Sequence, residues 1–483
     1  MPTDIVLAAI NARYAHASLG IRSLRANLGA LRERSGLMEF DLQADPARIA
    51  ETIVAAEPRI LGLGIYIWNV RLAKTVLREA RRRLPRMKIV LGGPEPAPAE
   101  FADLVLGGEG EVSFAEACGA WLAGREPDAG TGKPPDPERL ELPDAEYSDA
   151  DLATRVTYAE TSRGCPFGCE YCLSSLDRKV RYFPEEKARE SLDRMLRRGA
   201  RRFKFVDRTF NLDPDRAGRW LDFWLERARP GLSVQYEAVP ERFPAALRDR
   251  LRRFPPDLLR LEIGVQTLDP AVSETVGRRL DPQLVEDTFC FLRDETKVAV
   301  HADLIAGLPG EDLAGFARGF NRLMAWEPVE LQVGLLKRLS GAPIARHDAA
   351  HDMRYSPEPP YELISHRRWN AEDVLRIKRF ARFWDRTYNR GQLRKALPLL
   401  WGESGHAFEE FLAFSDWAFA QFGRDSGISL EQLASALARY LVEVRRLPNA
   451  QARLREAMGA NLPTAVSVGW RKIANEEITQ RQE

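Results

Sequence analysis

Three cysteines stand close together near the middle of the chain, at Cys165, Cys169 and Cys172. They are spaced CxxxCxxC and follow a short strand-like stretch at residues 157–160. A structural zinc site needs four N or S ligands, usually as two separated pairs, and no second Cys or Cys/His pair has a matching spacing. A cubane iron–sulfur cluster normally takes four thiolates, so three leave one iron free to chelate the amine and carboxylate of an amino acid. The spacing therefore predicts a [4Fe–4S] cluster with one open iron.

Composition agrees with a metal site in a reducing compartment. Five cysteines among 483 residues are too few for a disulfide framework, and we interpret Cys118 and Cys290 as buried structural thiols. The chain has 71 basic and 70 acidic residues, so it has no overall field that would attract nucleic acid or an anionic membrane. It has no leader-like start and no apolar run long enough to span a bilayer, and we expect a cytoplasmic protein without a membrane or nucleic-acid partner.

Strand-like and helix-like stretches alternate over the first 120 residues. The apolar stretches at 5–9, 38–42, 60–68, 88–93 and 104–108 are separated by helical periodicity, and two of them end in paired glycines. Alternation of this kind is typical of a parallel sheet covered by helices. Ligands of such sheets bind beyond the carboxyl ends of the strands, where glycine turns let the backbone approach closely.

A second alternating series follows a Pro- and Gly-rich connector. Six strand-like stretches, at 157–160, 203–207, 233–238, 259–266, 298–305 and 331–336, suit an incomplete (β/α) barrel. Beyond Trp369 the pattern is helical, with aromatic residues at three- and four-residue spacing. We therefore expect an α/β protein with a Rossmann-like domain at 1–124, a linker at 125–153, the barrel at 154–368 and a helical domain at 369–483.

The cysteine segment resembles the signature of the radical S-adenosylmethionine (SAM) superfamily, which has CxxxCxxC with an aromatic residue, here Tyr171, before the last cysteine. The resemblance implies a partial (β/α)6 barrel and reductive cleavage of SAM at the cluster to methionine and a 5′-deoxyadenosyl radical. Carried over position by position, it implies catalytic and metal-binding roles for the three cysteines. It also implies SAM contacts from Tyr171, Asp207, Glu237, Gln266 and Ile305.

The N-terminal sheet resembles the cobalamin-binding domain of cobalamin-dependent radical SAM enzymes. The resemblance implies cobalamin contacts from Leu19, Gly20, Tyr66, Trp68, Gly92, Gly93, Pro94, Gly108 and Glu109. The chain departs from cobalamin domains that supply a histidine ligand, because the D-x-H-x-x-G motif is absent around His16. We therefore interpret His16 as a loop or core residue. The helical C-terminal domain resembles one of uncharacterised role.

The resemblance implies methyl transfer to an unactivated carbon or phosphorus of a small molecule, with electrons from an external donor such as flavodoxin or ferredoxin. A second hypothesis keeps the cluster but has the radical drive a rearrangement or a non-standard cleavage of SAM, with cobalamin accessory or absent. A third, of another class, is an iron–sulfur redox sensor or scaffold. Transfer-RNA methylthiolation would want further cluster cysteines and a basic module that this chain lacks.

Overall fold

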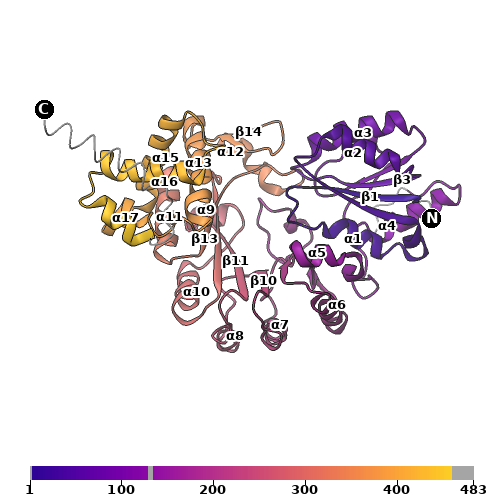
Figure 1. Ribbon diagram of the computed structural model, residues 1–483, viewed down its shortest axis with the longest axis horizontal. Coiled ribbons are helices and arrows are strands. Elements are labelled where there is room, and N and C mark those ends of the chain that lie inside the picture. The colour runs from indigo at the N-terminus through magenta and orange to yellow at the C-terminus, as the bar shows by residue number, and fades with distance from the viewer. Residues whose placement is uncertain (1–2, 129–133, 459–483) are drawn as a thin grey trace.

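The computed structural model describes residues 3–128 and 134–458. Residues 129–133 of the expected linker and 459–483 of the expected helical domain therefore lie outside the described residues. Figure 1 shows three parts in chain order from right to left, an α/β sheet, a curved barrel sheet below it and a helical bundle. None of the helices within the described residues is long and apolar enough to cross a membrane.

The N-terminal part is a five-stranded parallel sheet in the order β2-β1-β3-β4-β5. Its strands are β1 (Ile5–Asn11), β2 (Ser35–Asp41), β3 (Ile60–Gly64), β4 (Lys88–Gly92) and β5 (Leu104–Val105). One face is covered by α2 (Pro46–Ala55) and α3 (Val70–Arg83), and the other by α1 (Leu19–Ala26) and α4 (Glu111–Leu122). The order reverses at β1, so β1 and β3 flank the position where a ligand of such a sheet binds.

The second part is an open sheet of six parallel strands in the order β13-β12-β11-β10-β9-β6. These are β6 (Thr157–Ala159), β9 (Arg202–Phe205), β10 (Ser233–Glu237), β11 (Leu259–Gln266), β12 (Ala299–Ala306) and β13 (Glu330–Leu335). The helices between the strands include α6 (Glu185–Arg197), α7 (Pro214–Glu226), α8 (Ala245–Leu251), α10 (Pro282–Glu295) and α11 (Leu313–Ala325). Each strand overlaps a stretch expected from the sequence, and the α/β fold class is confirmed.

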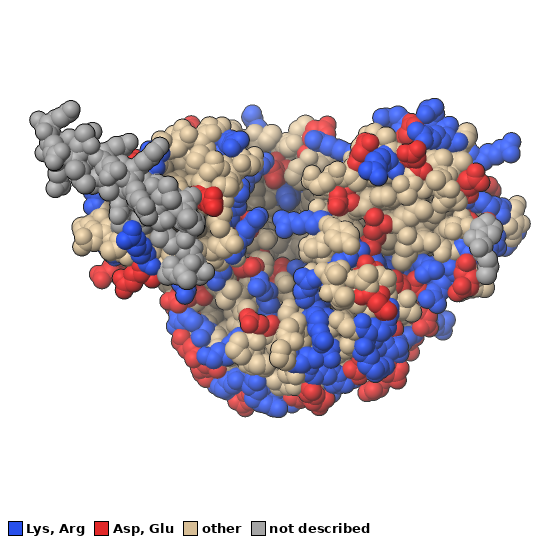
Figure 2. Space-filling model, viewed as in Figure 1, with Lys and Arg blue, Asp and Glu red and all other residues tan. Residues whose placement is uncertain are grey.

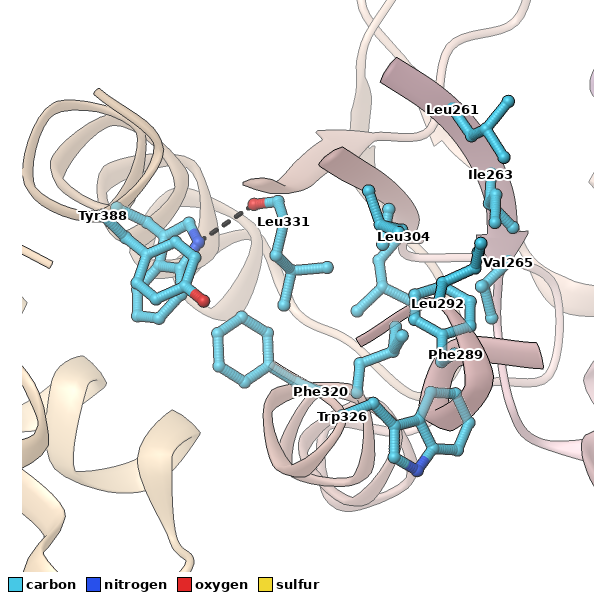
Figure 3. Packing of buried hydrophobic residues seen from close by; sticks show 14 of the residues in the cluster. Leu261, Ile263, Val265, Phe289, Leu292, Leu304, Phe320, Trp326, Leu331 and Tyr388 are labelled. Atoms are coloured by element: carbon cyan, nitrogen blue, oxygen red, sulfur yellow. Dashed lines mark hydrogen bonds between the residues drawn. The ribbon is translucent and has the colours of Figure 1, made fainter. Parts of the chain in front are cut away.

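Alternation along β11 explains how the barrel acquires two chemically different faces. Every second residue from Leu259 to Val265 is buried, and the residues between them are only partly buried. Figure 3 shows Leu261, Ile263 and Val265 of β11 on the side of the sheet where Phe289 and Leu292 of α10 pack. The intervening residues, Arg260, Glu262, Gly264 and Gln266, therefore face the barrel interior.

The helical part covers the free edge of β13. Its helices are α13 (Ala371–Trp384), the π-helical turn η6 (Asp385–Asn389), α15 (Ala407–Phe422), α16 (Leu430–Arg439) and α17 (Ala450–Met458). The Trp384 indole donates to the Leu331 carbonyl at 2.9 Å, drawn as the dashed line in Figure 3, and the Leu331 N–H donates to Asn389 at 3.0 Å. The Tyr388 hydroxyl donates to the Pro328 carbonyl at 2.7 Å.

The opposite edge of the barrel is covered by the N-terminal part and by the segment that follows it. The Val156 N–H, just before β6, donates to the Ala15 carbonyl at 2.8 Å, and the Tyr147 hydroxyl donates to the Tyr158 carbonyl at 2.7 Å. His16 lies in this contact, with Nδ1 2.9 Å from the Tyr158 hydroxyl. Both edge strands of the barrel therefore contact another part of the chain.

Candidate functional site

The three cysteines lie on a loop between two short antiparallel strands, β7 (Ser162–Arg163) and β8 (Arg181–Tyr182). The Cys165 N–H donates to the Asp177 carbonyl at 2.9 Å, which closes the loop at its base. Gly164 there has φ +87°, and a Cβ would lie 2.3 Å from the Lys179 carbonyl oxygen. Only glycine fits at this position, so the backbone before Cys165 is strictly determined.

Glu170 fixes the middle of the cysteine loop. Its backbone N–H donates to the Val276 carbonyl at 3.0 Å, and its carbonyl accepts from the Ile344 N–H at 2.9 Å. Its buried carboxylate lies 2.6 Å from His347 Nε2 and also accepts from Arg346. The loop is thus held between the segment after β11 and the segment after β13.

Asp207 holds the start of the loop to the end of β9. Its buried carboxylate accepts from the Thr161 N–H at 2.9 Å, the Thr161 hydroxyl at 2.6 Å and the Ser162 hydroxyl at 2.7 Å. Burial raises the pKa of Asp207, although these three donors act in the opposite direction. Asp207 does not line the cavity described next, so its position suits a role in placing the cysteine loop.

One cavity of about 240 Å³ brings the cysteines together with the carboxyl ends of the barrel strands. The residues expected from the sequence that line it are Cys165, Cys169, Cys172, Tyr171, Glu237 and Gln266. Within the strand end at 303–307, which the resemblance also implies as a SAM contact, Asp303 lines the cavity and Ile305 does not. Further lining residues that the sequence analysis missed include Arg208, Glu262, Arg278 and Arg279.

Two of the expected SAM contacts are unusual in conformation or charge. Burial raises the pKa of Glu237 to about 7, against the effect of Arg208, whose guanidinium lies 3.1 Å away. Gln266 has φ +69° at an irregularity in the pairing of β11 with β12. A left-handed backbone is costly in free energy for glutamine. It also gives the side chain a direction that differs from the one in a regular strand. Both groups face the cavity that contains the thiols.

Arg278 provides a positive charge beside the thiols. Its Nη1 donates to the Cys169 sulfur at 3.5 Å, its Nη2 donates to the Gly264 carbonyl, and its buried Nε has no hydrogen-bond partner among the described residues. A guanidinium so placed suits an anionic iron–sulfur core or an amino-acid carboxylate. No sequence signal separates Arg278 from the other 70 basic residues, because its partner Cys169 is 109 residues away.

The donor set fits a multinuclear cluster better than a single ion. Within the described residues, no group of three or more His, Cys, Asp or Glu side chains could hold one metal ion. In a cubane each thiolate binds a different iron, so three ligands on one loop need not converge on one point. Three thiols on one cavity wall with a partly buried cation against them therefore match the cluster better than they match zinc.

At the carboxyl edge of the N-terminal sheet the structure places a flat aromatic pair. The rings of Tyr66 and Trp68 stack with centroids 4.4 Å apart and planes 10° apart, and the Trp68 indole donates to the Ile10 carbonyl at 3.1 Å. A Cβ on Gly20, at the start of α1, would lie 3.4 Å from the Tyr66 hydroxyl. Leu19 begins the same helix. These residues border the β1/β3 switch point.

Gly92 ends β4, and Gly93 and Pro94 follow it at the same edge. Gly93 has φ +110°, and a Cβ there would lie 2.3 Å from the Ile65 carbonyl oxygen, so the close approach of the two loops requires glycine. Gly108 also has a positive φ, +74°, but open space around its Cβ position. The loops after β3 and β4 therefore form a tightly packed, glycine-dependent surface.

Glu109 contacts the barrel. Its carboxylate binds Arg163 at 2.8 Å and Arg181 at 2.5 Å, the residues that flank the cysteine loop in β7 and β8. Burial alone would raise the pKa of Glu109, but hydrogen bonds from the two arginines lower it. The expected cobalamin contact Glu109 thus joins the edge of the N-terminal sheet to the cysteine loop.

Comparison with known proteins finds three domain families in the chain. Residues 5–117 match the B12 binding domain, residues 159–319 match the radical SAM superfamily, and residues 349–460 match a protein family of unknown function, DUF4080. The first two imply cobalamin, SAM and a [4Fe–4S] cluster as cofactors.

Curated relatives agree with this combination. An uncharacterized methyltransferase, PH0819, of Pyrococcus horikoshii is 26% identical over 54% of this chain and 63% of its own length. The cobalamin-dependent radical SAM methyltransferase TokK of Streptomyces tokunonensis is 27% identical over 63% of this chain and 50% of its own length. The chain thus matches between half and two thirds of these relatives.

Two solved structures share the fold. The cobalamin-dependent SAM radical enzyme OxsB, with aqua-cobalamin and SAM bound, has a TM-score of 0.64 over 96% of this chain and 83% of its own, at 12% identity. The radical SAM methyltransferase TsrM of Kitasatospora setae, with cobalamin and a [4Fe–4S] cluster bound, has a TM-score of 0.58 over 74% of this chain and 78% of its own, at 15% identity. The domain matches thus identify a B12 binding domain followed by a radical SAM domain in this chain, and the two solved structures share its fold.

Proposed function

We propose that this protein is a cobalamin-dependent radical SAM methyltransferase that acts on an unactivated carbon, or a phosphorus, of a small molecule. The observation that carries the proposal is the contact between the N-terminal domain, with its sheet edge, and the cysteine loop of the barrel. The sheet edge with the Tyr66–Trp68 pair belongs to the same domain as Glu109, which binds both arginines that flank the cysteine loop. Figure 2 shows the molecule hollowed above the barrel, between the N-terminal and helical parts.

The three cysteines would hold the cluster, and the glycine loops and aromatic pair at the sheet edge would hold the corrin. When bound, the cluster supplies the electron that cleaves SAM, and cobalamin supplies the methyl group. Electrons would come from an external donor such as flavodoxin or ferredoxin.

This chain's own residues would bind and orient the reactants. Arg278 offers its free guanidinium donors to the carboxylate of SAM, while Glu237 and Gln266 accept or donate hydrogen bonds from the barrel strands. The Glu237 carboxyl, with its pKa near 7, holds a proton through part of the neutral range and can donate as well as accept. Cys169 is buried and Tyr171 is partly buried, which keeps water away from one side of the thiols.

Anaerobic purification of the protein with cobalamin supplied, followed by optical spectra and mass analysis of SAM products, tests the proposal. We expect both cluster and corrin absorption, with S-adenosylhomocysteine formed beside 5′-deoxyadenosine and one CH₂ unit added to the substrate. Cys169→Ser should abolish the cluster absorption and both products. Cys290→Ser, which changes a cysteine of α10 outside the cavity, is the matched control and should retain them.

The outcomes separate the alternatives. Two results would favour a non-methylating radical reaction over methyl transfer. One is cluster absorption without corrin absorption, and the other is 5′-deoxyadenosine without S-adenosylhomocysteine. If the cluster forms but SAM is never cleaved, the result would favour a redox-sensing or scaffold role.

A further inference from the structure

A second cavity, of about 430 Å³, lies between the carboxyl-terminal half of β13 and the helices α13 and η6. It shares no lining residue with the cavity of the cysteines. Its wall combines backbone of the edge strand, at Val333, Gly334 and Leu335, with basic side chains from both domains. The basic residues are Lys337, Lys378, Arg382, Arg386 and Arg390.

Three acidic residues in the same wall neutralise three of these cations. Glu362 binds Lys378, Asp425 binds Arg382 at 2.5 Å, and Asp385 binds Arg390 at 3.1 Å. Lys337 and Arg386 have no carboxylate partner among the residues that the structure describes. Arg386 donates to the Ile428 carbonyl, and its other guanidinium donors remain free for a ligand. Positive charge therefore exceeds negative charge in this cavity.

The free edge of β13 adds uncharged donors. The Leu331 N–H points away from β12, because it donates to Asn389 of η6. In a strand, residues two apart direct their backbone groups to the same side, so the N–H groups of Val333 and Leu335 point to this free edge as well. Within the described residues neither N–H has a partner there. From Leu336 the backbone is again paired, with Leu363.

We propose that this cavity binds an oxyanion, the carboxylate or phosphate group of a small molecule. Arg386 and Lys337 supply the charge, and the backbone N–H groups of Val333 and Leu335 supply donors that ligand binding satisfies. The unpaired edge is only three residues long, which is too short for an added peptide strand and suits a compact anionic group. The site is independent of methyl transfer and would give the helical domain a ligand of its own.

Isothermal titration calorimetry on the full-length protein with its cluster tests the site, with pyrophosphate and citrate as probes. We expect one equivalent of at least one probe to bind. The pair Lys337→Gln and Arg386→Gln should weaken that binding at least tenfold, because two charge-assisted contacts are lost. Arg424→Gln removes one positive charge from an exposed arginine outside the cavity and should change the affinity less than twofold. The probe that binds more tightly shows whether the site prefers a phosphate or a carboxylate group.

Absence of heat with both probes would overturn the proposal, as would equal affinity in the double variant. If the double variant does not fold, Lys337→Glu changes an exposed side chain alone and should also abolish binding. The titration contains no SAM, so its result stands whatever the outcome for methyl transfer.

Discussion

At the scale of single residues, several polar groups in the cavity of the cysteines have an unusual contact, pKa or backbone conformation. A guanidinium donates to a thiol sulfur, a glutamate titrates near neutral pH, and a glutamine has a left-handed backbone. The raised pKa of Glu237 and the left-handed backbone of Gln266 each reflect a cost in free energy, and such costs gather at functional sites.

Arg278→Gln should lower the reduction potential of the cluster. The positive charge beside Cys169 stabilises the reduced, more negative cluster, so its loss makes reduction harder by about 50 mV if the contact contributes about 1 kcal/mol. A redox titration followed by electron paramagnetic resonance measures the shift. Arg279→Gln changes an exposed neighbour and should shift the potential less; an unchanged potential in the Arg278 variant would contradict the assigned role.

Glu311 gives a pH-dependent stability. Burial raises its pKa from 4.5 to about 8, with the Thr267 hydroxyl donating to it and Asp269 nearby. The native state therefore keeps a proton that the unfolded chain releases, and this stabilisation is full below about pH 4.5 and lost as the pH rises through 8. Glu311→Gln should exceed the wild type in unfolding free energy by about 5 kcal/mol above pH 8, with little difference near pH 5. Denaturant unfolding across that range tests it, and a constant difference would refute the raised pKa.

At the scale of elements, the barrel depends on its neighbours because it is an open sheet. An uncovered edge presents unpaired N–H and C=O groups that invite association with other chains. Trp384 and Asn389 form hydrogen bonds with the backbone of Leu331. At the β6 edge, Ala15 and Tyr147 form hydrogen bonds with the backbone of Val156 and Tyr158. The helical part therefore stabilises the barrel in addition to any ligand it binds.

Trp384→Phe should destabilise the protein by about 1–2 kcal/mol. The phenyl ring keeps most of the packing, but the buried Leu331 carbonyl loses its donor. Thermal unfolding measures the change. Trp417→Phe makes the same replacement at a half-buried indole that has no hydrogen-bond partner among the described residues, and equal losses in the two variants would show that packing alone is responsible.

Local patterns predicted the elements and the thiols. Alternation in residues 259–266 indicated both the strand and its two faces, and the CxxxCxxC spacing indicated the cluster loop. The contacts that hold this loop could not be predicted in the same way. Glu170 meets His347 across 177 residues and Arg278 meets Cys169 across 109, and periodicity contains no information at that range. Glu109 was expected to face cobalamin, and only the structure reveals its two arginine partners.

At the scale of the whole molecule, ion pairs join the N-terminal part to the barrel. Arg163 of β7 binds Glu109 at 2.8 Å, Glu111 at 2.7 Å and Glu160 at 2.5 Å. All four side chains are largely buried, so the loss of Arg163 leaves Glu111 and Glu160 without a cation, whereas Glu109 keeps Arg181.

Arg163→Gln should therefore cost about 3–5 kcal/mol and uncouple the two parts. We expect differential scanning calorimetry to resolve two transitions where the wild type shows one. Arg367→Gln breaks an exposed pair with Asp352 and should change stability by less than about 0.5 kcal/mol. A single transition at the wild-type temperature in the Arg163 variant would disprove the coupling.

The cover of β13 has a consequence for how the protein is made. On the ribosome the N-terminal part emerges first and is in place when β6 is synthesised. The donor to Leu331, by contrast, lies 53 residues further along the chain. Every nascent chain therefore passes through an interval in which a finished barrel has one uncovered edge, and chaperone binding during that interval would raise the yield of native protein.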